Sequence, residues 1–306
     1  MGHAIGPTEA EAIIEIVRHA ARAEILPRFR RLAPADIRAK SAPDDLVTEA
    51  DLASEDRISA GLAAAFPGAC IIGEEGVAAD PALLGSLDGA DVAFVIDPID
   101  GTWNFAAGLA TFGVIVAAVE AGRTTMGLLY DPVMDDWVLA RSGGGAWMGR
   151  PGEAPRQLLL DGRATPGGPR GLGSAFNYPV PMRARLAEDL AALPRVEGLR
   201  CSCHEYRLLA QGRVDFVLAG ELKCWDHAAG VLAVEEAGGS VGLIDGRVYA
   251  PTLTEGRLVA AASPDILGDL RSRFAWIAET DAASEAAVQS PDPHRLPLEK
   301  TAPCRK

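Results

Sequence analysis

The chain has 306 residues, of which 48% are hydrophobic, and this is enough apolar material for one large domain or for two closely packed halves. The formal net charge of −13 argues against a nucleic-acid surface, because such a surface needs clustered Lys and Arg. The five cysteines do not indicate a disulfide framework, and no stretch is long and apolar enough to span a membrane, so we expect a soluble, cytoplasmic protein.

The N-terminal part of the chain predicts two helices. A capping box at residues 8–11 precedes apolar residues at helical spacing, which continue up to Pro27. A basic, loop-like stretch follows and ends at Lys40, which either lies near the functional site or is an ordinary exposed lysine. Thr48 then caps a second helix, and this makes Asp51 a capping or hydrogen-bonding residue rather than a metal ligand.

The most informative stretch is Asp97-Pro98-Ile99-Asp100-Gly101-Thr102-Trp103-Asn104-Phe105. The apolar run before it has the length and composition of a buried strand, so Asp97 lies where that strand ends. Pro98 favours an abrupt exit from the strand and brings Asp97 and Asp100 to one region, while Gly101 lets the backbone approach a ligand. Neighbouring carboxylates repel unless a cation lies between them. The stretch therefore predicts a magnesium–phosphate site, with an Asp-rich turn after a core strand as the simpler alternative.

Two further strand-like segments also end in acidic residues. One leads into Glu74 and Glu75, and the other, at 214–218, precedes Trp225 and Asp226. Three strands that all end in carboxylates favour the metal site over a turn. Asp226 also suits the N-cap of the helix that we expect after it.

The remaining segments predict a meander followed by α/β layers. The expected antiparallel strands of the meander lie at 112–120, 124–130 and 137–141. In the second half we expect helices near 183–192, 204–211 and 227–237, strands at 214–218 and 257–262, and a helix from 263. A flexible link is expected at 161–172 and a flexible polar tail at 281–306.

Cysteine and histidine residues suggest a second, weaker metal hypothesis. Cys201-Ser202-Cys203-His204, with Cys224, could form a zinc site, but the spacing differs from the paired pattern of structural zinc sites. His227, beside Asp226, suits packing better than catalysis.

Four signatures of the chain, in this order, resemble the inositol monophosphatase family, which belongs to the Mg²⁺-dependent, lithium-inhibited phosphomonoesterases. They cover the region from residue 8 to residue 275 and comprise Asp45-Leu46-Val47-Thr48-Glu49-Ala50-Asp51, Gly73-Glu74-Glu75, the stretch from Asp97 to Phe105, and Trp225-Asp226 with the glycines that follow.

The resemblance implies a layered α-β-α-β-α sandwich of the inositol monophosphatase and fructose-1,6-bisphosphatase type, of mixed α+β and α/β class. We expect one domain at 8–278, with an α+β half at about 8–160 and an α/β half at about 172–278. The site would lie between the halves, and such proteins are commonly homodimers.

The resemblance also implies the roles of the site residues. Two or three Mg²⁺ ions would be held by Glu74, Asp97, the carbonyl of Ile99, Asp100 and Asp226.

The attacking water would be oriented by Thr102 and its expected partner Asp45, helped by Glu74. The phosphate would be bound by the amides of Gly101 and Thr102, and by Asp100 and Asp226 through the metals.

The chain departs from the family pattern where the leaving group would bind. Residues 200–205, with Ser202, replace the usual Gly-Ser/Thr-Ala segment, and Ala219-Gly220 replaces an acid for which Glu221 could compensate, unless Glu221 is a solvated loop acid.

The leading hypothesis is hydrolysis of a small phosphorylated metabolite resembling inositol 1-phosphate. The alternatives are a histidinol-phosphate, 3′,5′-bisphosphonucleotide or fructose-1,6-bisphosphate phosphatase, and a non-catalytic relative that binds RNA or the transcription machinery.

Overall fold

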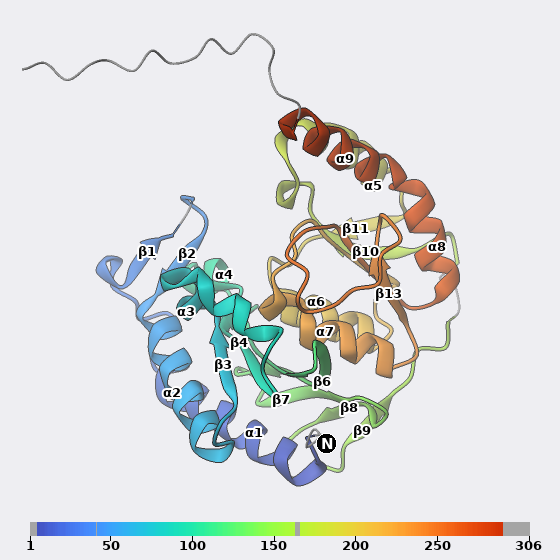
Figure 1. The fold of residues 1–306 in the computed structure, drawn as a ribbon. Coiled ribbons are helices and arrows are strands. Elements are labelled where there is room, and N and C mark those ends of the chain that lie inside the picture. Colours follow the sequence, from blue (N-terminus) through green and yellow to red (C-terminus); the bar gives the residue numbers. More distant parts are fainter. Residues whose placement is uncertain (1–4, 41, 163–165, 290–306) are drawn as a thin grey trace, which may run out of the picture.

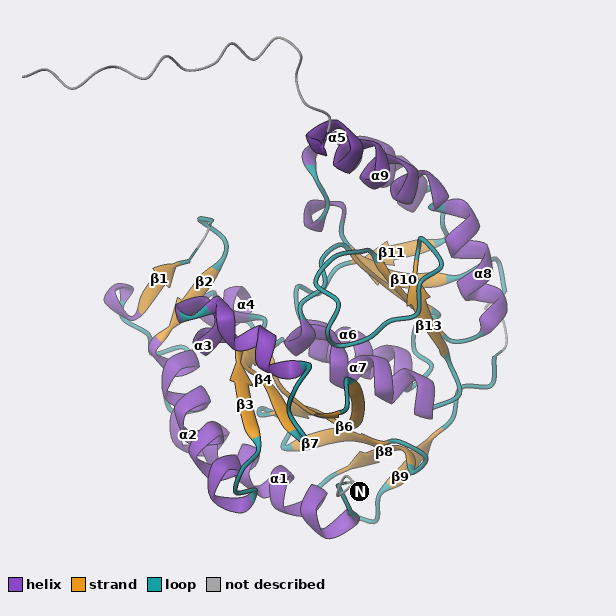
Figure 2. Cartoon of the chain, in the orientation of Figure 1, coloured by secondary structure: helices purple, strands orange, loops and turns teal. Residues whose placement is uncertain are grey.

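The computed structural model describes residues 5–40, 42–162 and 166–289. Layers of helices alternate with two sheets, in the order helix, sheet, helix, sheet, helix (Figures 1 and 2). The expected α-β-α-β-α sandwich is thereby confirmed.

The first outer layer consists of two helices whose apolar faces pack on the larger sheet. Helix α1 (Pro7–Ala20) continues as one π-helical turn to Ile25, and α2 (Glu49–Ala65) lies beside it. The predicted start of α1 was wrong by two residues, because Gly6 is the N-cap and the Glu9 carboxylate accepts its N–H at 2.6 Å. Proline is favoured in the first helical turn, where its missing N–H has no partner to lose.

The larger sheet is mixed and has seven strands in the order β3-β4-β5-β6-β7-β8-β9, of which β3 and β4 are parallel and the others antiparallel. The strands are β3 (Cys70–Gly73), β4 (Ala93–Asp100), β5 (Gly113–Glu120), β6 (Arg123–Asp131), β7 (Asp136–Arg141), β8 (Gly145–Gly149) and β9 (Arg156–Leu158). The predicted meander of β5, β6 and β7 is confirmed.

Both faces of this sheet are covered, so its central strands are apolar throughout. Along β4, Phe94 and Ile96 pack in the cluster beneath α1 and α2, whereas Ala93 and Val95 pack in the cluster on the opposite face. Strands buried on two faces give continuous apolar runs rather than alternation. This is why residues 92–96 could be recognised as a strand.

The middle layer contains α6 (Ser202–Ala210) and α7 (Cys224–Glu236), and α7 contacts both sheets. Glycines permit this close packing. A Cβ added at Gly127 would lie 2.7 Å from the Cα of Ala229, and one added at Gly230 would lie 2.2 Å from the ring of Tyr206. Helix α7 is therefore held tightly between the sheets.

The second sheet has five strands in the order β11-β10-β12-β14-β13. They are β10 (Arg170–Gly173), β11 (Arg195–Glu197), β12 (Phe216–Ala219), β13 (Ser240–Leu243) and β14 (Leu258–Ala261). The last layer consists of α5 (Val180–Ala191), α8 (Pro264–Arg273) and α9 (Ala275–Gln289) (Figure 1).

Of the short elements at the carboxyl ends of the strands, only a helical turn after Gly101 was predicted. These elements are the hairpin of β1 (Ile37–Ala39) and β2 (Leu46–Thr48), and the helices α3 (Glu74–Ala79) and α4 (Thr102–Ala106). Short 3₁₀ turns lie at Pro34–Asp36, Pro81–Leu87 and Ala175–Asn177.

The predicted tail boundary was wrong. Helix α9 runs on to Gln289, since its sequence beyond residue 281 is rich in Ala and Glu, which are good helix formers. The rest of the expected tail, at 290–306, and residues 163–165 of the expected link lie outside the described residues. Within the described chain, no helix is both long enough and apolar enough to cross a membrane.

Three phenylalanines pack around the base of the site and give a test of the core. Phe112 is fully buried, with its ring centroid 4.9 Å from that of Phe29 and 5.0 Å from that of Phe105. Phe112→Ala should lower the free energy of unfolding by about 3–5 kcal/mol, measured by urea denaturation. Leu109→Ala is the control, because Leu109 is 49% exposed and its truncation should have little effect. Equal losses in the two variants would contradict this view of the core.

Candidate active site and metal centre

Strand β4 delivers two carboxylates to its carboxyl end. Asp97 and Asp100 are 2% and 7% exposed, and the pairing of β4 with β5 shifts register between them. A bulge of this kind redirects side chains at the end of a strand. The bulge contains Pro98, which has no N–H to contribute to the ladder, and the two acids stay close together.

Gly101 makes the turn from β4 into α4. Its φ of +86° lies in the left-handed region, and an added Cβ would lie 2.9 Å from the carbonyl oxygen of Thr111. Both the backbone conformation and the close contact require glycine at this position. Thr102 therefore begins α4 immediately after the turn that ends β4.

Helix α7 adds a third carboxylate from the other half of the chain. Oxygen atoms of Asp97, Asp100 and Asp226 all lie within 4.8 Å of one another. Asp226 lies in the first turn of α7, where the helix dipole favours a negative charge, but the N-cap is Lys223 rather than Asp226. The structure thus brings together three of the acids predicted from separate motifs.

The N-terminal end of α6, with its N-cap Cys201, contacts Asp100. The thiol of Cys201 lies 3.0 Å from Oδ2 of Asp100, and the N–H of Cys203 donates to the same oxygen. Backbone donation from Ser202 also acts on Asp100. Ser202 therefore lies beside the acidic centre, as its predicted role requires, while the zinc hypothesis gains no support, because the potential metal-binding group found among the described residues is the aspartate cluster.

Glu74 begins α3 at the end of β3, beside the acidic centre. Lys40 bridges the two glutamates there, with Nζ 2.8 Å from Oε1 of Glu74 and 2.6 Å from Oε1 of Glu75. Although burial lowers the pKa of Lys40, both glutamates raise it, so the side chain is a cation held in the site. The alternative of an ordinary exposed lysine is wrong, since the side chain is only 15% exposed.

Sequence reasoning missed Glu55, which fixes the start of α3. Its carboxylate accepts the N–H groups of Glu75 and Gly76, both at 2.8 Å. A Cβ added at Gly73 would lie 2.1 Å from the carboxyl carbon of Glu55, so a side chain at this position would collide with the carboxylate. Glu55 lies on the inner face of α2 with no motif around it, and Gly73 was the only signal of a close approach.

The Thr102 hydroxyl contacts the carboxylate of Asp51, whereas the role expected for Asp45 beside Thr102 stays a prediction. The Thr102 hydroxyl lies 3.1 Å from Oδ1 of Asp51 and 3.0 Å from the carbonyl oxygen of Ile99. Asp45 lies in the turn between β1 and β2, where its backbone pairs with Lys40 at 2.7 Å. The two acids belong to one motif, and Asp51 lies in the first turn of α2.

Asp51 faces Thr102 because it is part of a helix cap. Its Oδ2 accepts the N–H of Thr48 at 2.9 Å and lies 2.5 Å from the Thr48 hydroxyl, which leaves Oδ1 for Thr102. The predicted cap at Thr48 is confirmed. Burial raises the pKa of Asp51 to about 7, so this carboxyl can exchange a proton near neutral pH.

A model of the inositol monophosphatase family matches residues 8–279 of the chain. The chain belongs to the inositol monophosphatase family. It is 35% identical over 209 residues to an inositol-1-monophosphatase of Mesorhizobium japonicum, covering 67% of this chain and 74% of the relative. It is 34% identical over 244 residues to a protein of Pseudomonas aeruginosa named Nus factor SuhB, covering 76% of this chain and 85% of the relative.

Solved structures of this family share the fold. An IMPase from Thermotoga maritima superposes with a TM-score of 0.74 at 24% identity, covering 89% of this chain and 99% of that one. An inositol monophosphatase from Zymomonas mobilis gives a TM-score of 0.69 at 24% identity, over 88% and 99% of the two chains.

Inositol monophosphatases are metal-dependent, and the electrostatics of this centre fit a bound cation. Burial raises the pKa of Asp97 well above its usual range, with Glu74 and the other aspartates adding to the effect, and burial beside Asp226 raises the pKa of Asp100 to about 8. Oδ1 of Asp97 is buried and has no hydrogen-bond partner. A buried carboxylate oxygen without a donor is stabilised by a metal ion, and carboxylates suit hard divalent cations.

His227 has a structural role, as expected. Its Nδ1 lies 3.0 Å from the Tyr206 hydroxyl and its Nε2 lies 2.8 Å from the carbonyl oxygen of Glu221. Burial lowers the pKa of His227 to about 4, so the ring is neutral. The side chain of Glu221 is 62% exposed and lies 3.8 Å from Nζ of Lys223.

The raised pKa values predict how stability depends on pH and metal. The pKa of Asp100 rises on folding from 3.8 to about 8, so the folded protein binds more protons than the unfolded chain in this range, and its free energy of unfolding falls as the pH rises. Mg²⁺ should therefore raise the melting temperature more at pH 8 than at pH 5, by about 5 °C or more at saturation. Melting curves in EDTA and in Mg²⁺ test this.

Asp100→Asn is the control for that measurement. It removes one of the repelling charges, so its melting temperature in EDTA should depend less on pH than that of the parent. An equal Mg²⁺ effect at both pH values would show that the cluster does not titrate as described.

Proposed function

We propose that the protein is a phosphomonoesterase that uses Mg²⁺ and water to hydrolyse a small phosphate monoester resembling inositol 1-phosphate. The observation that carries the proposal is the convergence of Asp97, Asp100 and Asp226 within 4.8 Å, with one buried oxygen of Asp97 left without a donor. Membership of a phosphatase family supports it.

Glu74, Asp97, the carbonyl of Ile99, Asp100 and Asp226 would hold two or three Mg²⁺ ions. When bound, Mg²⁺ supplies positive charge that activates water and polarises the phosphate. The amides of Gly101 and Thr102, at the turn into α4, would donate to the phosphate oxygens. Asp100 and Asp226 would contact the phosphate through the metals.

Thr102 and Asp51 provide a route for the proton of the attacking water. The Thr102 hydroxyl carries one proton and faces two acceptors, Oδ1 of Asp51 and the carbonyl oxygen of Ile99. When Asp51 is ionised it accepts this proton, and the Thr102 oxygen is free to accept one from water. A pKa of about 7 matches Asp51 to general-base work near neutral pH.

The side chains around the leaving group separate the candidate substrates. Glu221 and Ser202 would contact hydroxyls of a polyol, whereas a bisphosphate would need a second cationic site. Lys223 provides one cation, and Glu221 lies 3.8 Å from it. Because the negative charge of Glu221 offsets the positive charge of Lys223, a second phosphate group would be bound poorly there. This favours a polyol monophosphate over a 3′,5′-bisphosphonucleotide or fructose 1,6-bisphosphate.

Phosphate release from a panel of esters tests the proposed function. The panel contains inositol 1-phosphate, histidinol phosphate, adenosine 3′,5′-bisphosphate and fructose 1,6-bisphosphate, each with Mg²⁺, with EDTA and with added Li⁺. We expect Mg²⁺-dependent, Li⁺-sensitive turnover that is highest on inositol 1-phosphate. Asp97→Asn should abolish it, and turnover by this variant within a few-fold of the parent would show that the metal assignment is wrong.

A pair of variants tests the proton route. Asp51→Asn should lower kcat by about 10² or more, because the amide cannot accept the proton, and Thr102→Ala should do the same. Asp45→Asn is the matched control, since it alters the neighbouring acid of the same motif and should leave kcat within about two-fold. If steady-state kinetics gave a lower kcat for Asp45→Asn than for Asp51→Asn, Asp45 would be the functional partner of Thr102.

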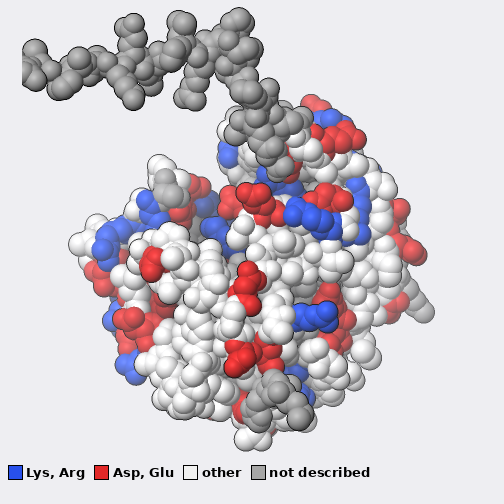
Figure 3. Space-filling model, viewed as in Figure 1, with Lys and Arg blue, Asp and Glu red and all other residues white. Residues whose placement is uncertain are grey.

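The name Nus factor SuhB, given to relatives in Pseudomonas aeruginosa and Pasteurella multocida, supports a second candidate role at the transcription machinery. Direct binding to RNA is the less favoured form of it, because the net charge is −13. On the face drawn in Figure 3, acidic and basic side chains lie in small interspersed groups without an extended basic area. The homodimer stays a prediction from the resemblance, and the cytoplasmic location stays a prediction from the cysteine content.

A further inference from the structure

The loop between β12 and α7 links the acidic centre to a second pocket. It runs from Gly220 to Lys223 and presents Glu221 and Lys223. Although burial lowers the pKa of Lys223, the nearby Asp226 and Glu74 raise it, so its ammonium group lies within the field of the proposed metal ligands. The position of this loop therefore sets what surrounds the leaving group.

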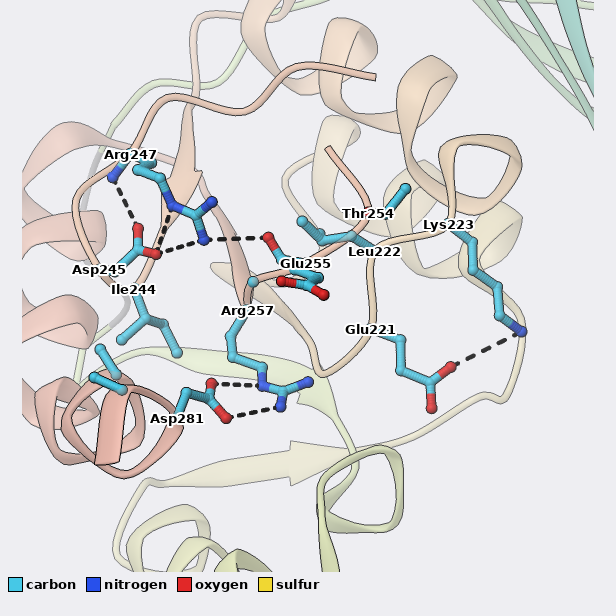
Figure 4. A pocket seen from close by; sticks show the side chains of 13 residues that line it. Glu221, Leu222, Lys223, Ile244, Asp245, Arg247, Thr254, Glu255, Arg257 and Asp281 are labelled. Carbon is cyan, nitrogen blue, oxygen red and sulfur yellow. Dashed lines mark hydrogen bonds and ion pairs between the residues drawn. The ribbon is translucent and has the colours of Figure 1, made fainter. Parts of the chain in front are cut away.

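Beside the loop lies a pocket of about 760 Å³ (Figure 4). Glu221 and Lys223 line one part of it, and Arg247, Arg257 and Asp281 are among the residues that line the rest. Figure 4 shows two ion pairs across the pocket from the loop, Arg247 with Asp245 and Arg257 with Asp281. The second pair reaches the loop through Arg257.

The side chain of Arg257 binds the backbone of the loop. Its Nη1 donates to the carbonyl oxygen of Gly220, while Nε and Nη2 donate to the two carboxylate oxygens of Asp281 at 3.1 and 2.9 Å. The guanidinium also lies over the ring of Tyr178, 5.5 Å from its centroid. A guanidinium held at both carboxylate oxygens has a fixed plane, so the third hydrogen bond is aimed at one place.

Two further contacts restrict the same loop. A Cβ at Gly220 would lie 2.3 Å from the carbonyl oxygen of Asn177, and the next carbonyl, that of Glu221, accepts a hydrogen bond from His227 at 2.8 Å. The loop is thus held from inside by His227 and from the pocket by Arg257. The inner contact belongs to α7 itself, whereas the outer one depends on α9.

We infer that Asp281 and Arg257 are positioning residues, which hold the loop of Gly220 to Lys223 in place and thereby select the leaving group. Asp281 lies beyond residue 279, where the match to the family model ends. The part of α9 that follows the family domain would therefore take part in substrate selection. The selection step rests on the proposed phosphatase function, and the clamp itself does not.

Asp281→Asn tests the inference with two readouts. Hydrogen exchange of the peptide that spans Gly220 to Lys223 should become about ten-fold faster, because the loop loses its outer anchor. The KM for inositol 1-phosphate should rise about ten-fold with kcat within about two-fold, while both constants for 4-nitrophenyl phosphate stay unchanged. Asp281→Glu, which keeps the carboxylate, should restore both readouts toward the parent values.

Asp245→Asn is the matched control. It weakens the other ion pair of the same pocket, in which Arg247 Nη2 lies 2.7 Å from Asp245, and it should leave loop exchange and KM unchanged. Identical behaviour of Asp245→Asn and Asp281→Asn would overturn the clamp. Faster loop exchange with an unchanged KM would overturn the selection of the leaving group. If the parent hydrolyses no phosphate ester, the proposed function fails, and hydrogen exchange alone still decides whether the clamp exists.

Discussion

Mutual repulsion of buried carboxylates is the constraint around which this fold is arranged. Asp97, Asp100 and Asp226 reach one point from β4 and α7, and Glu74 acts on them from α3. Concentrated negative charge of this kind is stable only when protons, ammonium groups or metal ions neutralise it. Lys40 and Lys223 supply part of the compensation, and a divalent cation would supply the rest. Binding of the proposed metal and the stability of the fold would therefore depend on the same charges.

Much of this centre could be predicted from the sequence because its acids end recognisable apolar strands. Asp97, Asp100 and Asp226 each lie in a motif with a buried run before or beside it, and the structure brings them together. The alternating layers could also be predicted, since the strands of the larger sheet are apolar on both faces. Periodicity and strand ends carry this information because they depend on local sequence.

Contacts between distant elements could not be predicted in the same way. The contact of Thr102 with Asp51 joins α4 to the first turn of α2, and the local pattern alone did not single out Asp51 for it. Glu55 and Lys40 act through contacts with α3 that no spacing in the sequence reveals. The contact of Asp281 with Arg257 joins α9 to a loop of the other sheet, and the Pro-rich polar sequence from residue 290 on placed the predicted end of the domain too early.

Helix α7 contacts both sheets along its length and carries Asp226 in its first turn. The other carboxylates of the centre come from elements attached to the larger sheet, so one ligand belongs to the layer that separates the sheets. Any sliding of the two sheets past each other would change the separation between Asp226 and its partners, and Mg²⁺ tolerates little departure from octahedral geometry. The affinity for metal would consequently depend on how the layers pack. A core defect far from the site would weaken metal binding before it unfolded the protein.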